Sequence, residues 1–215
     1  MFLIFTSIPL NSIAQVGSAA IKDINGNTYK TVLIGTQVWM AENLKTNKYN
    51  DGTAIPLVTD DMSWKTLTTP AYCWFDNDTI SNKYKYGALY NWYAASTNKL
   101  CPKGWHVPTD KEWTTLTTYL GGESVAGGNL KETDTTHWES PNVLATNESG
   151  FTALPSGYRN LVGLFNYIGK YGYWWSSTEC NVSYGWARII LYNGGSVDRV
   201  FTFKQDGWSV RCLKD

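Results

Sequence analysis

Residues 121–173 limit the possible folds of this chain more than any other segment, because they are rich in Gly, Asn, Ser and Thr and are interrupted by aromatic residues. A structureless loop of that length is uncommon inside a compact domain, and such loops are usually functional or partly structured. Aliphatic side chains are scarce there, so aromatic rings have to supply the packing. The whole chain has 11 Trp, 14 Tyr, 7 Phe and 19 Gly residues. We therefore expect short strands and long ordered loops held together by ring packing.

Three local patterns precede this segment. Residues Thr28–Met40 ("TYKTVLIGTQVWM") predict two strands joined by a two-residue turn at Gly35-Thr36. Residues 43–71 are rich in Asn, Asp and Thr and predict an ordered loop. Residues 86–96 ("YGALYNWYAAS") place apolar side chains at helical spacing and predict a helix.

The segment "CPKGWHVPTDKEW" (residues 101–113) leads into a second predicted helix. Thr109 and Glu112 form a capping box, and Pro108 ends the extended stretch before it. Apolar residues follow at helical spacing from Trp113, and Gly121-Gly122 ends the helix.

The last forty residues return to strand patterns. The strings "YWWSST", "ARIILY", "SVDRVF" and "WSVRCL" are separated by turns, including those at residues 193–195 and 206–207. Strands at both ends and two early helices predict an α+β domain with a large loop insertion.

The N-terminal residues predict export. Residues 1–10 form an apolar run too short to span a bilayer, and Ser12-Ile13-Ala14 supplies the small residues that signal peptidase accepts. We expect a signal peptide over residues 1–14, with the start codon placed too far downstream, since no Lys or Arg precedes the apolar run. The alternative is a buried first strand.

A linker over residues 15–22 and one domain over residues 23–215 complete the expected organisation. No other apolar stretch approaches the length of a membrane span, so we expect a secreted or cell-surface-associated protein without one. The net charge is zero, with 18 Lys and Arg against 18 Asp and Glu, which gives no reason to expect nucleic acid or an anionic membrane as partner.

Export changes the interpretation of the four cysteines. They are Cys73, Cys101, Cys180 and Cys212, and no two form a CxxC pair. In an oxidising compartment an even number of cysteines favours disulfides over metal ligation, and four cysteines allow three pairings.

Six blocks of the chain resemble a known family. The blocks "VWMAENLKTNKYNDGTAIP", "YGALYNWYAA", "CPKGWHVPTDKEW", "NESGFTALPSGYRN", "GYWWSSTE" and "WSVRCLKD" occur here in the order found in the Fibrobacter succinogenes major paralogous domain family. The resemblance covers residues 23–215. It implies an exported protein and leaves the biochemical role open.

The same blocks are more loosely similar to the formylglycine-generating, sulfatase-modifying group. The counterparts are residues 90–92, 107–113, 175–177 and 208–211. That similarity implies a C-type-lectin-like domain: α+β, with a small twisted antiparallel sheet, two helices and long ordered loops that carry function.

The similarity also bears on the cysteines. The C-type lectin fold has a long-range bridge near its C-terminus, which implies a Cys101–Cys212 disulfide; Cys73 and Cys180 then either pair or stay free. The closely spaced late cysteines of the formylglycine-generating enzymes are absent, since Cys180 and Cys212 are far apart. Copper-dependent oxidase chemistry is therefore not expected.

Metal sites have weak support in the sequence. Cys101, His106 and His137 are too few for a zinc site. Asp76-Asn-Asp78 begins like an EF-hand loop, but Ile80 replaces the third ligand. Calcium at Asp76 and Asp78 is one interpretation, and an Asx-rich turn is the other; we expect no further cofactor. The string "ESPN" at residues 139–142 does not match the sugar-binding pattern of calcium-dependent lectins.

The aromatic-rich stretch and its neighbourhood supply the candidate ligand contacts. Exposed rings stack on sugars, and Asn, Glu and Arg side chains bond hydroxyl groups. The alternative is that the rings pack the loop core; strand alternation predicts that only one of Trp174 and Trp175 faces inward. The candidates are Trp138, Asn147, Glu148, Tyr158, Arg159, Tyr167, Tyr171, Trp174, Trp175 and Trp186.

These patterns favour an exported, non-catalytic binding module whose partner is a glycan or a surface protein. One alternative is an enzyme on a formylglycine-generating-like fold with altered chemistry, although no pair of carboxylates can be assigned from sequence for glycoside hydrolysis. The other is a purely structural surface component.

Overall fold

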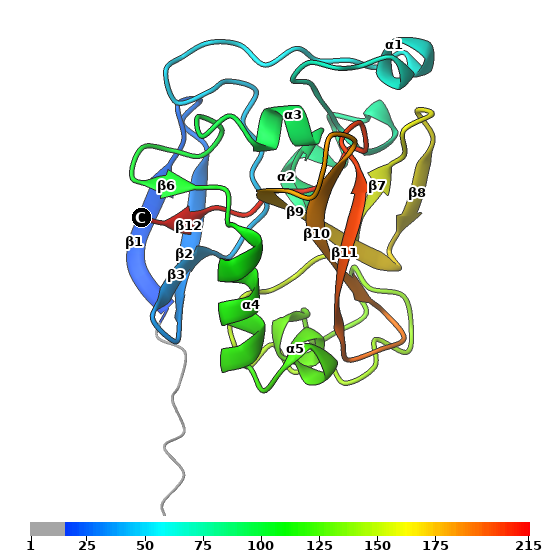
Figure 1. The fold of residues 1–215 in the computed structure, drawn as a ribbon. Helices are drawn as coiled ribbons and strands as arrows, with labels where there is room; N and C mark the ends of the chain where they lie inside the picture. Colours follow the sequence, from blue (N-terminus) through cyan, green and yellow to red (C-terminus); the bar gives the residue numbers. More distant parts are fainter. Residues whose placement is uncertain (1–15) are drawn as a thin grey trace, which may run out of the picture.

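The structure, a computed structural model, describes residues 16–215 (Figure 1). The predicted signal peptide, residues 1–14, lies outside the described residues. The described chain is a mixed α/β domain with curled antiparallel sheets and few helices. None of the helices in residues 16–215 is long and apolar enough to cross a membrane.

One sheet has the strand order β1-β2-β3-β12-β6 and is antiparallel throughout. β2 and β3 form the predicted hairpin, with Gly35 of its turn at a φ of 61°, where glycine meets no Cβ penalty. β1 covers most of the predicted linker, because the edge of β2 needs backbone partners. The strands are β1 (Val16–Lys22), β2 (Thr28–Ile34), β3 (Gln37–Met40), β6 (Trp105–His106) and β12 (Leu213–Lys214).

A second sheet, with the order β11-β10-β9, stands on the other side of the molecule (Figure 1). The hairpin β7–β8 lies within the long Gly- and Asn-rich stretch, which is therefore partly structured, and a short ribbon pairs β4 with β5. These strands are β4 (Tyr72–Cys73), β5 (Leu89–Tyr90), β7 (Ser156–Arg159), β8 (Phe165–Ile168), β9 (Tyr171–Glu179), β10 (Tyr184–Leu191) and β11 (Val197–Phe203).

Helix α4 (Asp110–Tyr119) starts at the predicted capping box: Thr109 Oγ1 accepts from the backbone N–H of Glu112, and the Glu112 carboxylate accepts from that of Thr109. Helix α5 (Glu123–Leu130) follows at once and was not predicted, because its two glycines disfavour a helix. A Cβ on Gly127 would lie 2.1 Å from the backbone oxygen of Ser196, so tertiary packing requires glycine there.

The helix predicted over residues 86–96 is confirmed only at Trp92–Ala95, which form α3. Leu89 and Tyr90 form β5, because the backbone of Tyr90 pairs with Tyr72 and Trp208. Gly87, at a φ of 78°, separates this strand from the helix before it. The remaining helical turns are α1 (Asp61–Lys65), η1 (Phe75–Asn77), α2 (Lys83–Tyr86) and α3 (Trp92–Ala95).

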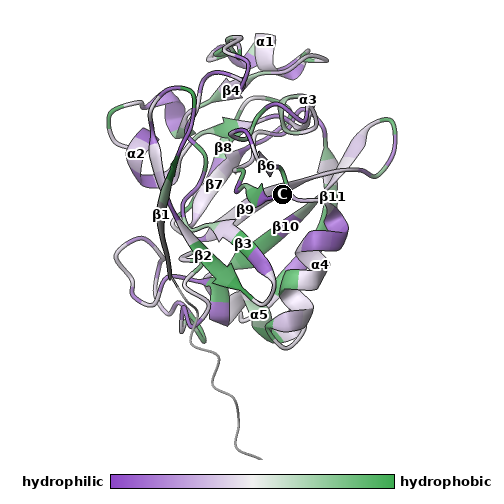
Figure 2. Ribbon diagram, turned by 90° about the vertical axis from the view of Figure 1, so that its left-hand side faces the viewer, coloured by the Kyte–Doolittle hydropathy of each residue, from purple (hydrophilic) through white to green (hydrophobic). Residues whose placement is uncertain are grey.

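Strand β9 runs between two hydrophobic cores. Trp174 packs with Trp39, Trp113 and Phe151 on one face, whereas Trp175 packs with Trp208 in the other core. The prediction that only one of the two tryptophans faces inward is therefore wrong, because both faces of the strand are covered. Figure 2 shows hydrophobic colouring along β2 and the strands behind it, and hydrophilic colouring on α2 and the outer side of α4.

Residues 208–212 connect the two sheets instead of forming the predicted strand. The backbone N–H of Ser209 donates to Tyr173 in β9, and the carbonyl of Cys212 accepts from Met40 in β3. Only Leu213–Lys214 joins a ladder, as β12, which lies between β3 and β6 (Figure 1).

The Cys101–Cys212 disulfide is present, with a Cα–Cα distance of 5.9 Å. It joins the segment before β6 to the one before β12. Cys73 is buried and Cys180 half-buried, and both are free, so the alternative of a Cys73–Cys180 bridge is wrong.

Buried cations fix the long loops. Lys131 Nζ donates to the backbone oxygens of Val143, Leu191 and Gly194 at 2.7–3.1 Å. Arg211 likewise donates to the backbone oxygens of Phe151 and Thr152. Because one side chain bonds several carbonyls, each loop is held without a ladder of its own.

Candidate functional site

Several predicted ligand contacts are core residues. Trp138, Trp174 and Trp175 are at most 1% exposed, and each indole N–H is hydrogen-bonded inside the protein. Trp174 donates to Asn43 Oδ1 and Trp175 to the backbone oxygen of Tyr90. These three rings are not accessible to a ligand, because they are packed in the core.

Arg159 is also buried, and its guanidinium bonds inward. Its donors reach the backbone oxygens of Val58, Thr59 and Gly163, and Nη2 lies 2.6 Å from Asp61 Oδ1. Arg159 therefore anchors loops and does not contact a ligand as predicted.

Asn147 closes a local turn. Its side chain bonds the Thr152 hydroxyl at 3.0 Å and the Thr152 N–H at 2.8 Å. Glu148 is exposed beside it. No hydrogen bond or ring contact among residues 16–215 connects this pair with the exposed aromatic rings described next.

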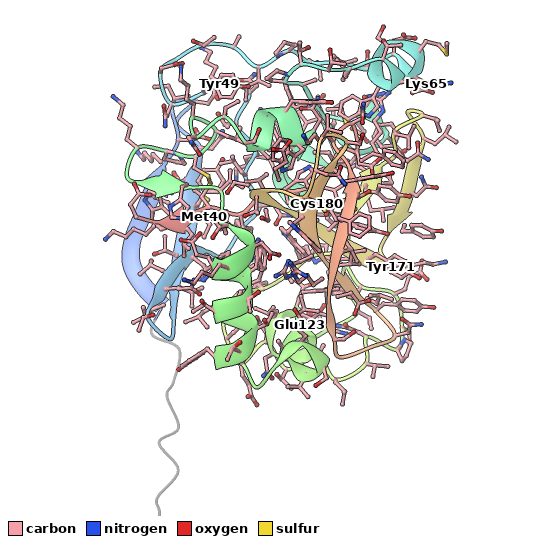
Figure 3. All side chains as sticks on the ribbon, in the orientation of Figure 1. Met40, Tyr49, Lys65, Glu123, Tyr171 and Cys180 are labelled. Carbon is pink, nitrogen blue, oxygen red and sulfur yellow. A yellow bond between two sulfur atoms is a disulfide. The ribbon has the colours of Figure 1, made fainter. Side chains whose placement is uncertain are left out.

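Three of the predicted tyrosines do come together. Tyr158, Tyr167 and Tyr171 form a stacked series with Tyr192 at its end, here named the tyrosine row. Ring centroids are 6.2 Å apart for Tyr158–Tyr167, with planes at 11°, and 4.8 Å apart for Tyr167–Tyr171, with planes at 28°. Tyr171 and Tyr192 follow at 6.5 Å. Tyr167 is 49% exposed, and Figure 3 labels Tyr171 on the side formed by the second sheet.

Local backbone geometry brings the row together. The turn between β8 and β9 folds back at Tyr167, whose φ is 60° and whose carbonyl accepts from the N–H of Lys170 at 3.1 Å. Tyr171 therefore begins β9 directly beside Tyr167. Tyr192 follows β10, and its N–H donates to the carbonyl of Lys170.

A groove of about 490 Å³ adjoins the row at Tyr158. Its lining includes Tyr158, Tyr173, Trp208 and Asp206, with residues of β10, β11 and the loop 160–162. The Tyr173 centroid lies 4.7 Å from that of Tyr158 and 4.8 Å from that of Trp208. The row and this groove together form the candidate site.

Asp206 is the charged residue of the groove. It is 4% exposed, and its carboxylate accepts a hydrogen bond from the Thr202 hydroxyl. Burial raises the pKa of Asp206 to about 6. The sequence indicated only a turn at Asp206-Gly207 and did not predict the groove. The i, i+2 spacing of Tyr171 and Tyr173 is the sequence pattern that places these two rings on the same face of a strand.

Trp186 lies elsewhere. It contacts Phe201 at 5.7 Å, and Phe201 and Phe203 both contact Tyr184; these four residues are named the β10–β11 patch. Arg199 covers Trp186, with its guanidinium carbon 3.5 Å from the ring centroid. Trp186 thus contacts Phe201 and Arg199 and is not part of the tyrosine row.

The acids of the predicted calcium loop have local roles. Asp78 Oδ1 accepts from the N–H groups of Ile80 and Ser81, as an Asx turn does. Asp76 lines a polar hollow of about 570 Å³ with Asp60 and Asp61, but Asp60 caps α1 and Asp61 bonds Arg159. Within residues 16–215 no three His, Cys, Asp or Glu side chains are grouped to hold a metal.

The cysteine–histidine segment, residues 101–113, has a structural role. Cys101 is in the disulfide, and His106 bonds Asp215 Oδ1 at 2.7 Å and Glu112 Oε1 at 3.0 Å. Burial raises the pKa of the free Cys73 thiol to about 12, so it is not a thiolate near neutral pH.

Comparison with known proteins identifies the family. No curated protein and no solved structure matches the chain. The sequence model of the Fibrobacter succinogenes major domain matches residues 32–214, which include most of the core residues, the disulfide, the tyrosine row and the groove. The chain therefore belongs to the Fibrobacter succinogenes major domain family.

Proposed function

We propose that the protein is an exported, non-catalytic module that binds a glycan along the tyrosine row. One observation carries this proposal: Tyr158, Tyr167 and Tyr171 stack in series with near-parallel planes, and Tyr167 is half exposed. A row of amphipathic rings presents flat apolar faces with hydroxyl groups at their edges, which suits the alternating apolar and hydroxylated faces of a sugar chain.

Polar groups beside the row support the same ligand class. Lys170 lies between Tyr167 and Tyr171 in sequence, and its Nζ is 3.7 Å from Glu139 Oε2. Both side chains are substantially exposed, so this surface ion pair is weak and its atoms remain open to sugar hydroxyls.

The proposed fold is C-type-lectin-like, a mixed domain in which long loops carry function. The curled antiparallel sheets, the few helices and the long-range Cys101–Cys212 disulfide support this assignment. The disulfide also supports export to the cell surface or the medium, where disulfides persist.

The test is a glycan array probed with the oxidised protein, with calcium and again with a chelator. We expect binding that is lost in Tyr167→Ala and Tyr171→Ala and retained in Tyr84→Ala, because Tyr84 is an exposed tyrosine of α2 outside the row. Loss of glycan binding in the presence of the chelator would indicate a calcium requirement. A blank array from folded protein, or equal binding by all three variants, contradicts the proposal.

A surface-protein partner is the second candidate, favoured by the β10–β11 patch. Phe201 is 54% and Phe203 39% exposed, in contact with other rings. Exposed apolar patches of this kind mark protein interfaces. Phe201 and Phe203 also line the groove, so the variant is made at Tyr184, which does not. Binding to surface-protein extracts should then fall in Tyr184→Ser and persist in Tyr167→Ala, the reverse of the glycan result.

A further inference from the structure

We propose that the groove binds a positively charged ammonium group of the ligand, with Asp206 as its counter-ion and Tyr158, Tyr173 and Trp208 as its aromatic wall. This deepens the proposed function by naming the ligand class as a sugar with a free amino group, and it rests on that function because Tyr158 belongs to both the row and the groove.

The charged group in the lining of the groove is an acid. Asp206 lines the groove, and no Lys, Arg or His does so among the described residues. An acidic sugar or a phosphate would meet a like charge in a partly enclosed space, which costs binding energy, whereas a cation is attracted.

Asp206 has no cationic partner. None of the ion pairs within residues 16–215 includes it, and the Thr202 hydroxyl is a neutral donor. The partly buried Asp110 differs, because it is paired with Arg188 and Arg199. An entering ammonium group would supply the positive charge that the protein does not.

The ring wall favours the same charge. Tyr158, Tyr173 and Trp208 pack at centroid distances of 4.7, 4.8 and 6.1 Å. Aromatic faces carry negative electrostatic potential and attract cations within about 6 Å, most strongly when water is excluded. The groove therefore combines the attraction of the Asp206 carboxylate for a cation with that of several aromatic rings.

Protonation should control this site. Burial raises the pKa of Asp206 to about 6, and the titratable groups electrostatically coupled to it are Tyr158 and Tyr173. Burial raises the pKa of both tyrosines, so they stay neutral near pH 6 and Asp206 is the group that titrates. Since the cation needs the ionised carboxylate, the affinity for tetramethylammonium, whose charge does not change with pH, should rise about tenfold from pH 5 to pH 7.

The experiment is titration calorimetry of the oxidised protein with four probes at matched ionic strength. They are a β-1,4-linked glucosamine tetramer, its N-acetylated counterpart, a galacturonic acid trimer and tetramethylammonium chloride. We expect the amino sugar to bind about tenfold more tightly than the acetylated one, a difference of about 1.4 kcal/mol. The acidic trimer should not bind.

Asp206→Asn should remove the preference for the amino sugar. Asp198→Asn, which changes an exposed acid of β11, the strand that precedes Asp206, should keep it. If Asp206→Asn does not fold, the pH dependence of tetramethylammonium binding to the unmodified protein decides: an affinity equal at pH 5 and pH 7 overturns the ammonium site. Tighter binding of the acetylated or acidic probe also overturns it.

The two proposals fail in different ways. Binding of tetramethylammonium that depends on Asp206, with no glycan binding, supports the ammonium site and contradicts the glycan function. Binding of the acetylated tetramer that depends on Tyr167 but not on Asp206 supports the glycan function and contradicts the ammonium site.

Discussion

Arg211 and Asn43 are joined in the interior by a hydrogen bond of 2.9 Å from Nε to Oδ1. The same oxygen accepts from Trp174 Nε1 at 2.9 Å, and the Asn43 amide donates to the carbonyl of Tyr86. A single amide thus forms hydrogen bonds with a buried cation, a buried indole and the last carbonyl of α2.

Asn43→Ala should therefore lower the free energy of unfolding by about 2–4 kcal/mol, because it leaves the buried donors of Arg211 and Trp174 without an acceptor. Urea denaturation followed by tryptophan fluorescence measures this. Asn193→Ala, at an exposed turn position, is the control and should change stability by less than about 0.5 kcal/mol. Equal stability of the two variants would show that the network contributes little.

Replacing both Cys101 and Cys212 by serine should cost about 4–5 kcal/mol on the chain-entropy account, because the bridge closes a loop with a sequence separation of 111. Cys180→Ser, which removes a free thiol, is the control. Chemical denaturation of the three proteins gives the values. A double variant as stable as the control contradicts the expectation.

The two free thiols should react differently with iodoacetamide in the native protein. Cys73 is fully buried, and burial raises its pKa to about 12, whereas Cys180 is half-buried. Mass spectrometry should find label on Cys180 alone until denaturant is added. Early label on Cys73 would mean that its core opens readily.

Asp206 should make the protein less stable as pH rises. Its pKa is about 6 in the folded chain against an ordinary 3.8, so between these values the folded state binds more protons than the unfolded state. Stability should fall from pH 4 to pH 7 by up to about 3 kcal/mol, at about 1.4 kcal/mol per pKa difference of one. Urea denaturation at both pH values should show this fall relative to Asp206→Asn. The same change in stability between the two pH values in both proteins would contradict it.

Local chemistry made part of the fold predictable. The Gly35-Thr36 turn and the capping box of Thr109 and Glu112 are signals within a few residues, and both are present. Leu89 and Tyr90 were misassigned because their strand depends on Tyr72 and Trp208, which no local pattern reveals.

The candidate site shows the same limit. The sequence located the aromatic-rich region, and three of its tyrosines form the row. It could not show that both Trp174 and Trp175 are buried, because alternation along one strand does not tell whether its second face is covered. Asp206 is part of the groove only because β7, β9 and β11 meet around it.

The crossing segment, residues 208–212, has a consequence for the order in which the chain can assemble. β3 (Gln37–Met40) receives its second neighbour, β12, only when Leu213 has been made, and β9 receives Ser209 from the same segment. A polypeptide delivered N-terminus first must therefore keep the edge of β3 open, and exposed to wrong pairing, until residue 213 emerges. The slow step in maturation should thus be a late closure that locks both halves at once, so a chain interrupted before residue 208 should aggregate instead of folding in part.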